Sequence, residues 1–103
     1  MLLATLTFRV QPYKRAEALS ALDFLTQRMR GTAGCARSRI LTDSDDQNVL
    51  IIASEWQDAA AADAFFNSRE FQIFKGIRML MRDEPYIVMD EVRARVTRLM
   101  RAS

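Results

Sequence analysis

The stretch from Val49 to Phe74 constrains the fold more than any other part of the chain. It begins with an apolar run typical of a strand, reaches Trp56, the only tryptophan, and turns at once into an alanine-rich helix from Ala59. Asp58 is placed to cap this helix, because its carboxylate can accept hydrogen bonds from the first free backbone N–H groups. Small α+β domains tend to open pockets at such junctions, so Trp56 indicates where a site is expected.

Hydrophobic periodicity predicts the remaining elements. Gly31 follows the first helix and is expected to adopt a left-handed C-cap. The order β-α-β-β-α-β predicts an α+β, ferredoxin-like fold, in which helices cover one face of a four-stranded antiparallel sheet. We expect helices over residues 14–30 and from Ala59, with an interruption at Asn67 and Ser68, and strands over residues 2–10, 35–43, 48–56 and 86–92.

The second face of the predicted sheet is also apolar. The strand segments 49–53 and 86–89 carry apolar side chains at consecutive positions. A sheet face in contact with water would alternate more cleanly between apolar and polar residues. We therefore expect a homodimer in which two sheets pack face to face and enclose a barrel-like interior, a dimeric α+β barrel.

Length and charge divide the chain into one domain and a short extension. A chain of 103 residues has room for one core. The net charge is +2, but the last eleven residues hold four arginines and no acid, so residues 1–92 carry −2. We expect an ordered domain over 1–92 and a basic extension over 93–103. The extension is either a solvated tail or, if helical, a docking segment with an apolar stripe.

The composition limits the cellular setting and the chemistry. A single cysteine, Cys35, and the lack of a signal peptide or long apolar run predict a cytoplasmic protein without membrane contact. Basic residues and aromatic residues are not interleaved, so no nucleic-acid partner is predicted. The chain contains no histidine, which excludes histidine-ligated zinc or haem and imidazole-based catalysis. We predict no metal site and no cofactor site.

Four short motifs are spread along the domain: S-E-W at 54–56 with the alanine-rich helix after it, N-S-R-E-F at 67–71, G-C at 34–35 and P-Y-I at 85–87. Together they resemble the antibiotic biosynthesis monooxygenase domain family. The resemblance covers residues 2–92. It implies a homodimeric barrel with a hydrophobic pocket between sheet and helices in each subunit. Some members oxidise phenolic or quinol-like aromatics with dioxygen and no metal or flavin, because the deprotonated substrate supplies the electrons.

The chain departs from two branches of that family. Many quinol-oxidising relatives carry a histidine on the helix where Phe65 and Phe66 stand here. The haem-degrading branch uses an asparagine in the first strand, a tryptophan on the helix and a histidine ligand. Thr7, Phe65 and the histidine-free segment 72–78 occupy those places, so haem degradation is disfavoured.

These patterns predict a cofactor-independent monooxygenase that oxidises a quinol-type or polycyclic phenolic substrate, a small aromatic molecule. The alternatives are a non-catalytic dimeric module that binds a small ligand or is associated with stress, and a partner subunit that docks through its basic extension. A tryptophan at a strand end is also a common packing anchor, and an asparagine between helical segments a common cap. The predicted catalytic residues are Trp56, Asn67 and Tyr86, and the predicted substrate-binding residues are Phe65, Phe66, Phe71, Phe74 and Arg78.

Overall fold

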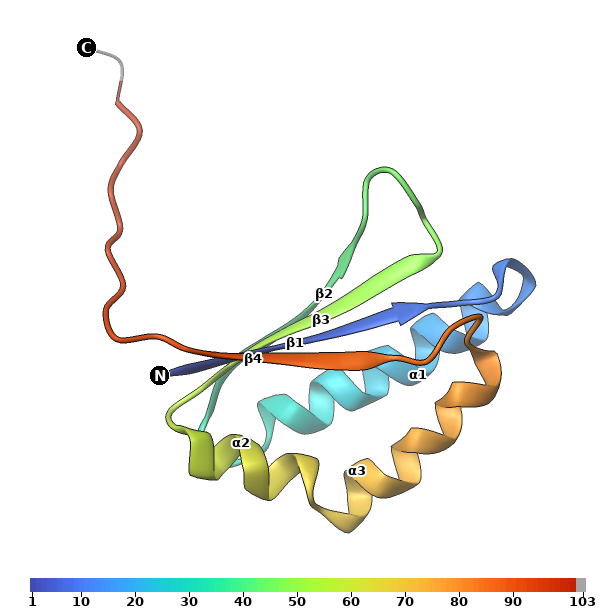
Figure 1. Ribbon diagram of the computed structural model, residues 1–103, viewed down its shortest axis with the longest axis horizontal. Coiled ribbons are helices and arrows are strands. Elements are labelled where there is room, and N and C mark those ends of the chain that lie inside the picture. Colours follow the sequence, from blue (N-terminus) through green and yellow to red (C-terminus); the bar gives the residue numbers. More distant parts are fainter. Residues whose placement is uncertain (102–103) are drawn as a thin grey trace.

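The computed structural model describes residues 1–101 (Figure 1). The chain adopts the predicted α+β, ferredoxin-like fold, with the second helical region divided into three pieces. The elements in chain order are β1 (Leu2–Arg9), the 3-10 helix η1 (Pro12–Lys14), α1 (Arg15–Arg30), β2 (Cys35–Thr42), β3 (Val49–Trp56), α2 (Ala59–Phe66), α3 (Arg69–Phe74), the 3-10 helix η2 (Lys75–Leu80) and β4 (Tyr86–Glu91).

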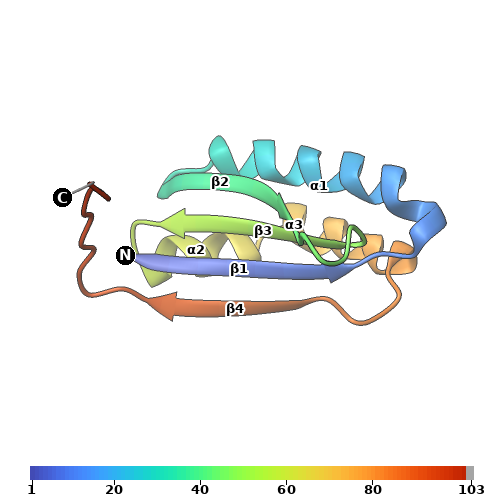
Figure 2. The same cartoon turned by 90° about the horizontal axis from the view of Figure 1, so that it is seen from above.

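The four strands form one antiparallel sheet in the order β2-β3-β1-β4. Leu6 in the central strand β1 lies opposite Ile52 of β3 on one side and Ile87 of β4 on the other. All helices lie behind the same face of this sheet, and β4 lies at an edge beyond them (Figure 2). All six residues of β4 are exposed, because neither face of this edge strand is fully covered.

Strand alternation separates the core from the open face of the sheet. Side chains at even positions of β1 and β3 face the helices, and all of them are buried. Side chains at the odd positions of β1 and β3 face away from the helices. The strand register places Leu41 of β2 and Tyr86 and Val88 of β4 on the same open face, where they are 39%, 53% and 44% exposed. The open face therefore keeps the apolar character that the sequence indicated.

Two side-chain caps set the helix boundaries after the sheet. Asp58 Oδ1 accepts a hydrogen bond of 2.8 Å from the backbone N–H of Ala61, as predicted. Ser68 Oγ accepts from the N–H of Phe71 over 3.2 Å, which begins α3. Each cap satisfies a backbone donor that has no partner within its helix. The two helices therefore begin at residues that the sequence marks.

The left-handed glycine is Gly34, and the prediction for Gly31 was wrong. Gly31 caps α1 with a φ of −85°, whereas Gly34 has a φ of +87°. A Cβ at Gly34 would lie 2.5 Å from the Cβ of Ala61, so this loop also needs a residue without a side chain. The glycine before β2 thus admits a close approach of the loop to α2.

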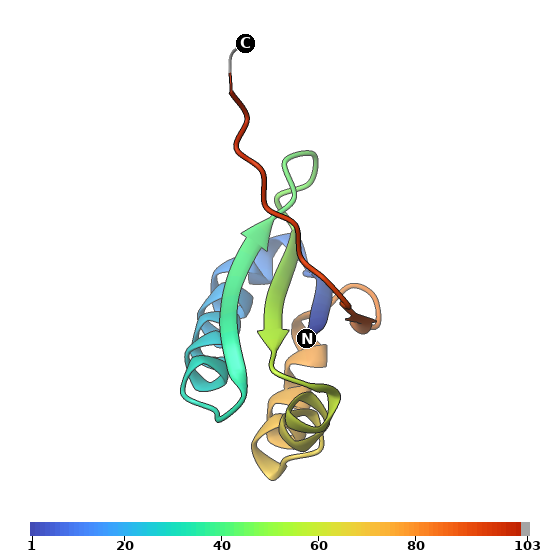
Figure 3. The same cartoon turned by 90° about the vertical axis from the view of Figure 1, so that its left-hand side faces the viewer.

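The C-terminal segment over residues 92–101 forms neither helix nor strand, so its helical interpretation was wrong. It runs away from the body of the domain (Figure 3). An ion pair joins Arg95 Nη2 of this segment to Glu55 Oε1 over 2.7 Å, while Val96, Leu99 and Met100 are at least 72% exposed.

Within the described residues, no helix combines the length and the apolar character that crossing a membrane requires.

Candidate functional site

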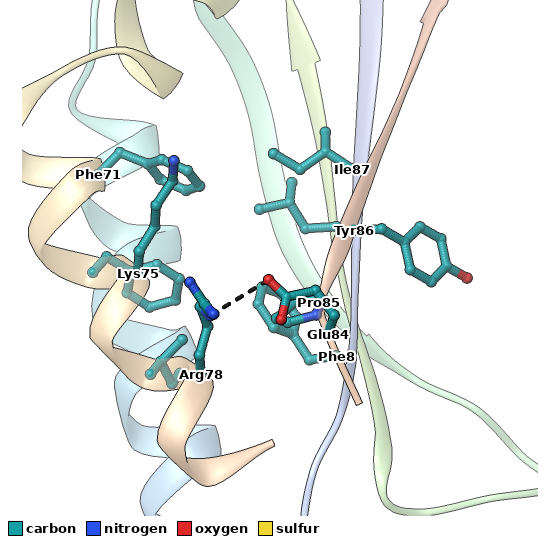
Figure 4. A pocket seen from close by; sticks show the side chains of 11 residues that line it. Phe8, Phe71, Lys75, Arg78, Glu84, Pro85, Tyr86 and Ile87 are labelled. Atoms are coloured by element: carbon teal, nitrogen blue, oxygen red, sulfur yellow. Dashed lines mark ion pairs between the residues drawn. The ribbon is translucent and has the colours of Figure 1, made fainter. Parts of the chain in front are cut away.

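A cavity of about 250 Å³ lies between the sheet edge and the last helical turns (Figure 4). One wall comes from β1, β4 and the residues before β4, and the other from α3 and η2. Its lining residues are Leu6, Phe8, Phe71, Phe74, Lys75, Ile77, Arg78, Glu84, Pro85, Tyr86 and Ile87.

The floor of the cavity is apolar and largely aromatic. Leu6, Phe8, Phe71 and Ile77 are each no more than 8% exposed. The Phe74 ring meets Phe8 edge to face at 6.3 Å between centroids and lies 5.9 Å from the Phe71 ring. Edge-to-face and offset arrangements are the preferred aromatic geometries, so the rings form an ordered surface against which a flat ligand can pack.

The rim of the cavity is charged. Arg78 Nε lies 3.4 Å from Glu84 Oε1, and this ion pair crosses the mouth from η2 to the residues before β4 (Figure 4). Lys75 Nζ lies 6.0 Å from the centroid of the Phe71 ring, a cation–π contact at the edge of the floor. The cavity therefore combines an apolar interior with two cations and one anion at its opening.

Backbone contacts fix the rim relative to the sheet. Val10 forms an isolated antiparallel bridge with Met81. The N–H of Gln11 donates to the carbonyl of Leu80 over 3.0 Å, and the N–H of Arg82 donates to the carbonyl of Arg9 over 2.7 Å. These bonds tie the end of η2 and the start of the segment that leads to Glu84 to the end of β1.

Trp56 lies inside the core and is not among the residues that line the cavity. Its side chain is fully buried, and its Nε1 donates to Ser54 Oγ over 2.9 Å. Its ring is 5.4 Å from Phe65 and 5.8 Å from Phe66. Phe65 and Phe66 in turn lie 5.8 and 5.0 Å from Phe71. The aromatic cluster thus runs from Trp56 to the cavity floor without a break.

Asn67 and Tyr86 do not place polar atoms in the cavity. Asn67 is the exposed C-cap of α2, and its N–H donates to the carbonyl of Asp63. Tyr86 borders the cavity, yet its ring points away from it (Figure 4). The sheet register explains this direction, because Tyr86 pairs with Thr7, whose side chain is on the open face. The catalytic roles of both residues stay predictions.

Of the predicted site residues, Phe71, Phe74, Arg78 and Tyr86 border the cavity, while Phe65, Phe66, Trp56 and Asn67 lie outside its lining. Sequence reasoning did not assign Leu6, Phe8, Lys75, Glu84 and Ile87 to the site. The alternation of the first strand already placed Leu6 and Phe8 on one face. The three-residue spacing of Lys75 and Arg78 was the available sign of a shared helical face.

A larger hollow of about 830 Å³ lies between α1 and α3, away from the sheet. Phe24 and Ile73 line it and are 58% and 72% exposed, so it is a groove on the outer surface. Arg28 crosses it, in an ion pair with Glu70 of 3.0 Å and over the Phe24 ring. The cavity beside β4 is the better candidate site, because its apolar floor is buried.

Residues 1–101 contain no group of three or more histidine, cysteine, aspartate or glutamate side chains that could hold a metal ion. The one cysteine, Cys35, begins β2 and is half-buried. Desolvation by burial raises the pKa of its thiol. This effect is larger than the opposite effects of the hydrogen bond to the Arg37 backbone and of the positive charge of Arg30, which lower the pKa. The thiol lies outside the lining of the cavity.

Comparison with known proteins establishes the family. The sequence model described as antibiotic biosynthesis monooxygenase matches residues 1–76, about three quarters of the chain. The chain belongs to the antibiotic biosynthesis monooxygenase family. This confirms the resemblance that the short motifs indicated, and it places the strand, tryptophan and helix junction inside the part that characterises the family.

Solved structures share the fold of this family member at low sequence identity. A crystal structure of an antibiotic biosynthesis monooxygenase superposes with a TM-score of 0.82 and 20% identity, covering 91% of this chain and all of that one. Rv0793 from Mycobacterium tuberculosis superposes with a TM-score of 0.84 and 14% identity, covering 93% of this chain and 98% of that one. These similarities support the ferredoxin-like architecture.

One curated relative is similar in sequence over a shorter range. The Natronomonas pharaonis protein named "Putative heme-binding protein NP_2262A" is 31% identical over 65 residues. These residues are 63% of this family member and 11% of the relative. This chain therefore corresponds to a small part of that longer protein.

Proposed function

We propose that the protein is a cofactor-independent monooxygenase that oxidises a quinol-type or fused-ring phenolic substrate with dioxygen. The observation that carries the proposal is the cavity beside β4, which has an aromatic floor and two cations at its rim. Cavities for drug-sized ligands measure roughly 300–1,000 Å³. A volume of about 250 Å³ favours a substrate of one to three fused rings over a larger polycycle.

The proposed reaction uses electrons from the substrate. The phenolic substrate loses a proton to solvent at the rim, and the resulting anion transfers electrons to dioxygen. The ring carbon opposite the phenolate oxygen loses its hydrogen and becomes a carbonyl carbon, and the phenolate carbon becomes the second carbonyl carbon. One oxygen atom forms the new C–O bond, and the other leaves as water with that hydrogen and one proton from solvent. The four electrons that reduce dioxygen come from the substrate, so the chain need only bind, orient and stabilise the anion.

In this proposal the binding residues are those that border the cavity. Phe71 and Phe74 pack against the ring, and the positive charge of the rim, from Lys75 and Arg78, stabilises the developing negative charge on the substrate. Trp56, Phe65 and Phe66 hold Phe71 in position from behind through the aromatic cluster. Asn67 lies outside the cavity lining and the Tyr86 ring points away from the cavity, so binding of the ring does not depend on them, and their catalytic roles stay predictions.

Oxygen uptake with a panel of anthrones and quinols tests the proposal. We expect uptake with the wild-type protein and a reduced kcat/KM in Phe74→Leu, which keeps an apolar side chain but removes the ring that contacts Phe8 and Phe71. Arg98→Ala is the control, since Arg98 lies in the extended C-terminal segment. No uptake with any member of the panel would contradict the proposed reaction.

We propose further that two copies associate through their open sheet faces. Support comes from the half-exposed apolar side chains on that face and from the family, whose members are commonly dimeric. We propose that this dimer is cytoplasmic and has no nucleic-acid or membrane partner. Support comes from the single cysteine, Cys35, and from residues 1–101, in which no helix could cross a membrane.

A second candidate function is non-catalytic binding of a small aromatic ligand. It is favoured by the absence of histidine from the sequence, since Phe65 and Phe66 provide no acid or base. The curated relative is named for binding heme, which is also a flat aromatic ligand. Saturable binding of aromatic probes with no oxygen uptake would favour this function over the monooxygenase.

A further inference from the structure

We propose that the rim of the cavity is a carboxylate subsite, in which Lys75 and Arg78 bind an anionic substituent of the aromatic ligand and displace Glu84 from its ion pair. This inference rests on the proposed function only in taking the cavity beside β4 as the ligand site. It adds the chemical class of the ligand: a small aromatic acid, with its ring on the phenylalanine floor and its carboxylate at the mouth.

The distribution of polarity orients the ligand. The floor residues Leu6, Phe8 and Ile77 offer no side-chain hydrogen-bonding group and are nearly inaccessible to water. A polar substituent placed against them would lose its hydration without gaining a partner. Arg78 and Glu84 meet at the opening, and the Lys75 ammonium lies beside the Phe71 ring at the edge of the floor (Figure 4). A ligand with one polar end therefore enters ring first and leaves that end at the rim.

The charge of the rim determines which polar end fits. Lys75 and Arg78 contribute two positive charges and Glu84 one negative charge. Arg78 is paired with Glu84, whereas the ion pairs found among residues 1–101 include none to Lys75. One positive charge at the mouth is left without a counter-charge, and a ligand carboxylate would supply it. A cationic ligand would be repelled.

The Arg78–Glu84 ion pair is weak enough to be exchanged. The two side chains are 61% and 73% exposed, and ion pairs at such surface positions contribute little to stability. A carboxylate on a ring that is held by the floor is fixed in place and partly shielded from water. Arg78 can bind it with two parallel N–H donors, a geometry stronger than its single 3.4 Å contact with Glu84.

Calorimetric binding of two matched probes tests the inference. 2-Naphthoate and 2-naphthamide share the ring system and nearly the same size, but only the first is charged. We expect the wild-type protein to bind 2-naphthoate about tenfold more tightly, the combined effect of two partly exposed charge contacts. Lys75→Met with Arg78→Met should remove this preference by weakening 2-naphthoate binding, with a much smaller change for the uncharged 2-naphthamide. Glu84→Gln should raise 2-naphthoate affinity about threefold, because it removes the competing anion.

Arg82→Met is the matched control. It removes one positive charge from a half-exposed side chain just beyond η2, outside the cavity lining. It should keep the wild-type preference for 2-naphthoate. Equal affinity for both probes, no binding of either, or a preference that survives the double substitution would overturn the inference. Charge-dependent binding without oxygen uptake would contradict the monooxygenase alone, whereas uptake without any preference for acids would contradict this subsite alone.

Discussion

The indole N–H of Trp56 donates to the hydroxyl oxygen of Ser54 over 2.9 Å, and the same hydroxyl donates to the carbonyl of Ala4 over 2.9 Å. Ser54 is 1% exposed and Trp56 is fully buried. The hydroxyl therefore joins β3 to β1 and satisfies the single polar atom of a large core side chain. Without it, the indole N–H would be buried with no partner.

This relationship predicts that Ser54→Ala lowers the free energy of unfolding by about 1–3 kcal/mol, the cost of a buried unpaired donor. Urea denaturation followed by circular dichroism, at one fixed protein concentration, measures the change. Ser38→Ala is the matched control, because Ser38 is the cross-strand partner of Ser54 and its hydroxyl donates to a weak acceptor, Met29 Sδ, over 3.2 Å. Equal costs for the two substitutions would contradict the prediction.

A second prediction concerns the approach of Gly34 to α2. Gly34→Ala should destabilise the protein by about 2–4 kcal/mol, from a strained positive φ and a Cβ only 2.5 Å from that of Ala61. Gly31→Ala should be neutral or slightly stabilising, since Gly31 has a φ of −85° and a Cβ added there would lie 3.7 Å from the carbonyl oxygen of Arg28. Thermal unfolding of both variants compares them. A Gly34→Ala variant as stable as Gly31→Ala would refute this account.

These glycines show why part of the structure could be predicted from sequence and part could not. The caps Asp58 and Ser68 depend on backbone groups within three residues, so their local sequence was sufficient. The positive φ of Gly34 accompanies contact with Ala61, a residue 27 positions later in the chain. The local pattern favoured Gly31 as the left-handed glycine because Gly31 follows a helix. It could not show that α2 would pack against the loop at Gly34.

The candidate site follows the same rule. Phe71, Phe74 and Arg78 come from one continuous segment whose spacing was visible, and all three border the cavity. The opposite wall comes from β1 and from the residues around β4, which are distant in sequence. Trp56 was a good guide to the fold, yet its burial separates it from the cavity. The junction of a strand end and a helix start therefore predicted where the aromatic cluster lies. It did not predict the cavity, which lies at the other end of that cluster.

A third prediction tests association through the open sheet face. Thr5 lies in the central strand between Ala53 and Val88, with its side chain on that face. Thr5→Arg would place like charges in the centre of a symmetric interface, so we expect light scattering to give the mass of one 11.8 kDa chain instead of two. Thr42→Arg, in an exposed position of the edge strand β2, should leave the dimer intact. A monomeric wild type, or a dimeric Thr5→Arg, would contradict the proposed interface.

A fourth prediction follows from the burial of Cys35, which raises the pKa of its thiol. Because the folded state favours the neutral thiol, the stability contributed by this shift is complete below the unfolded-state pKa and is lost as pH rises through the folded-state pKa. Alkylation by iodoacetamide requires the thiolate, so its rate in the native protein should rise at a higher pH than in urea. Cys35→Ser should remove the corresponding alkaline loss of stability. A native alkylation midpoint at or below that of the unfolded chain would disprove the shift.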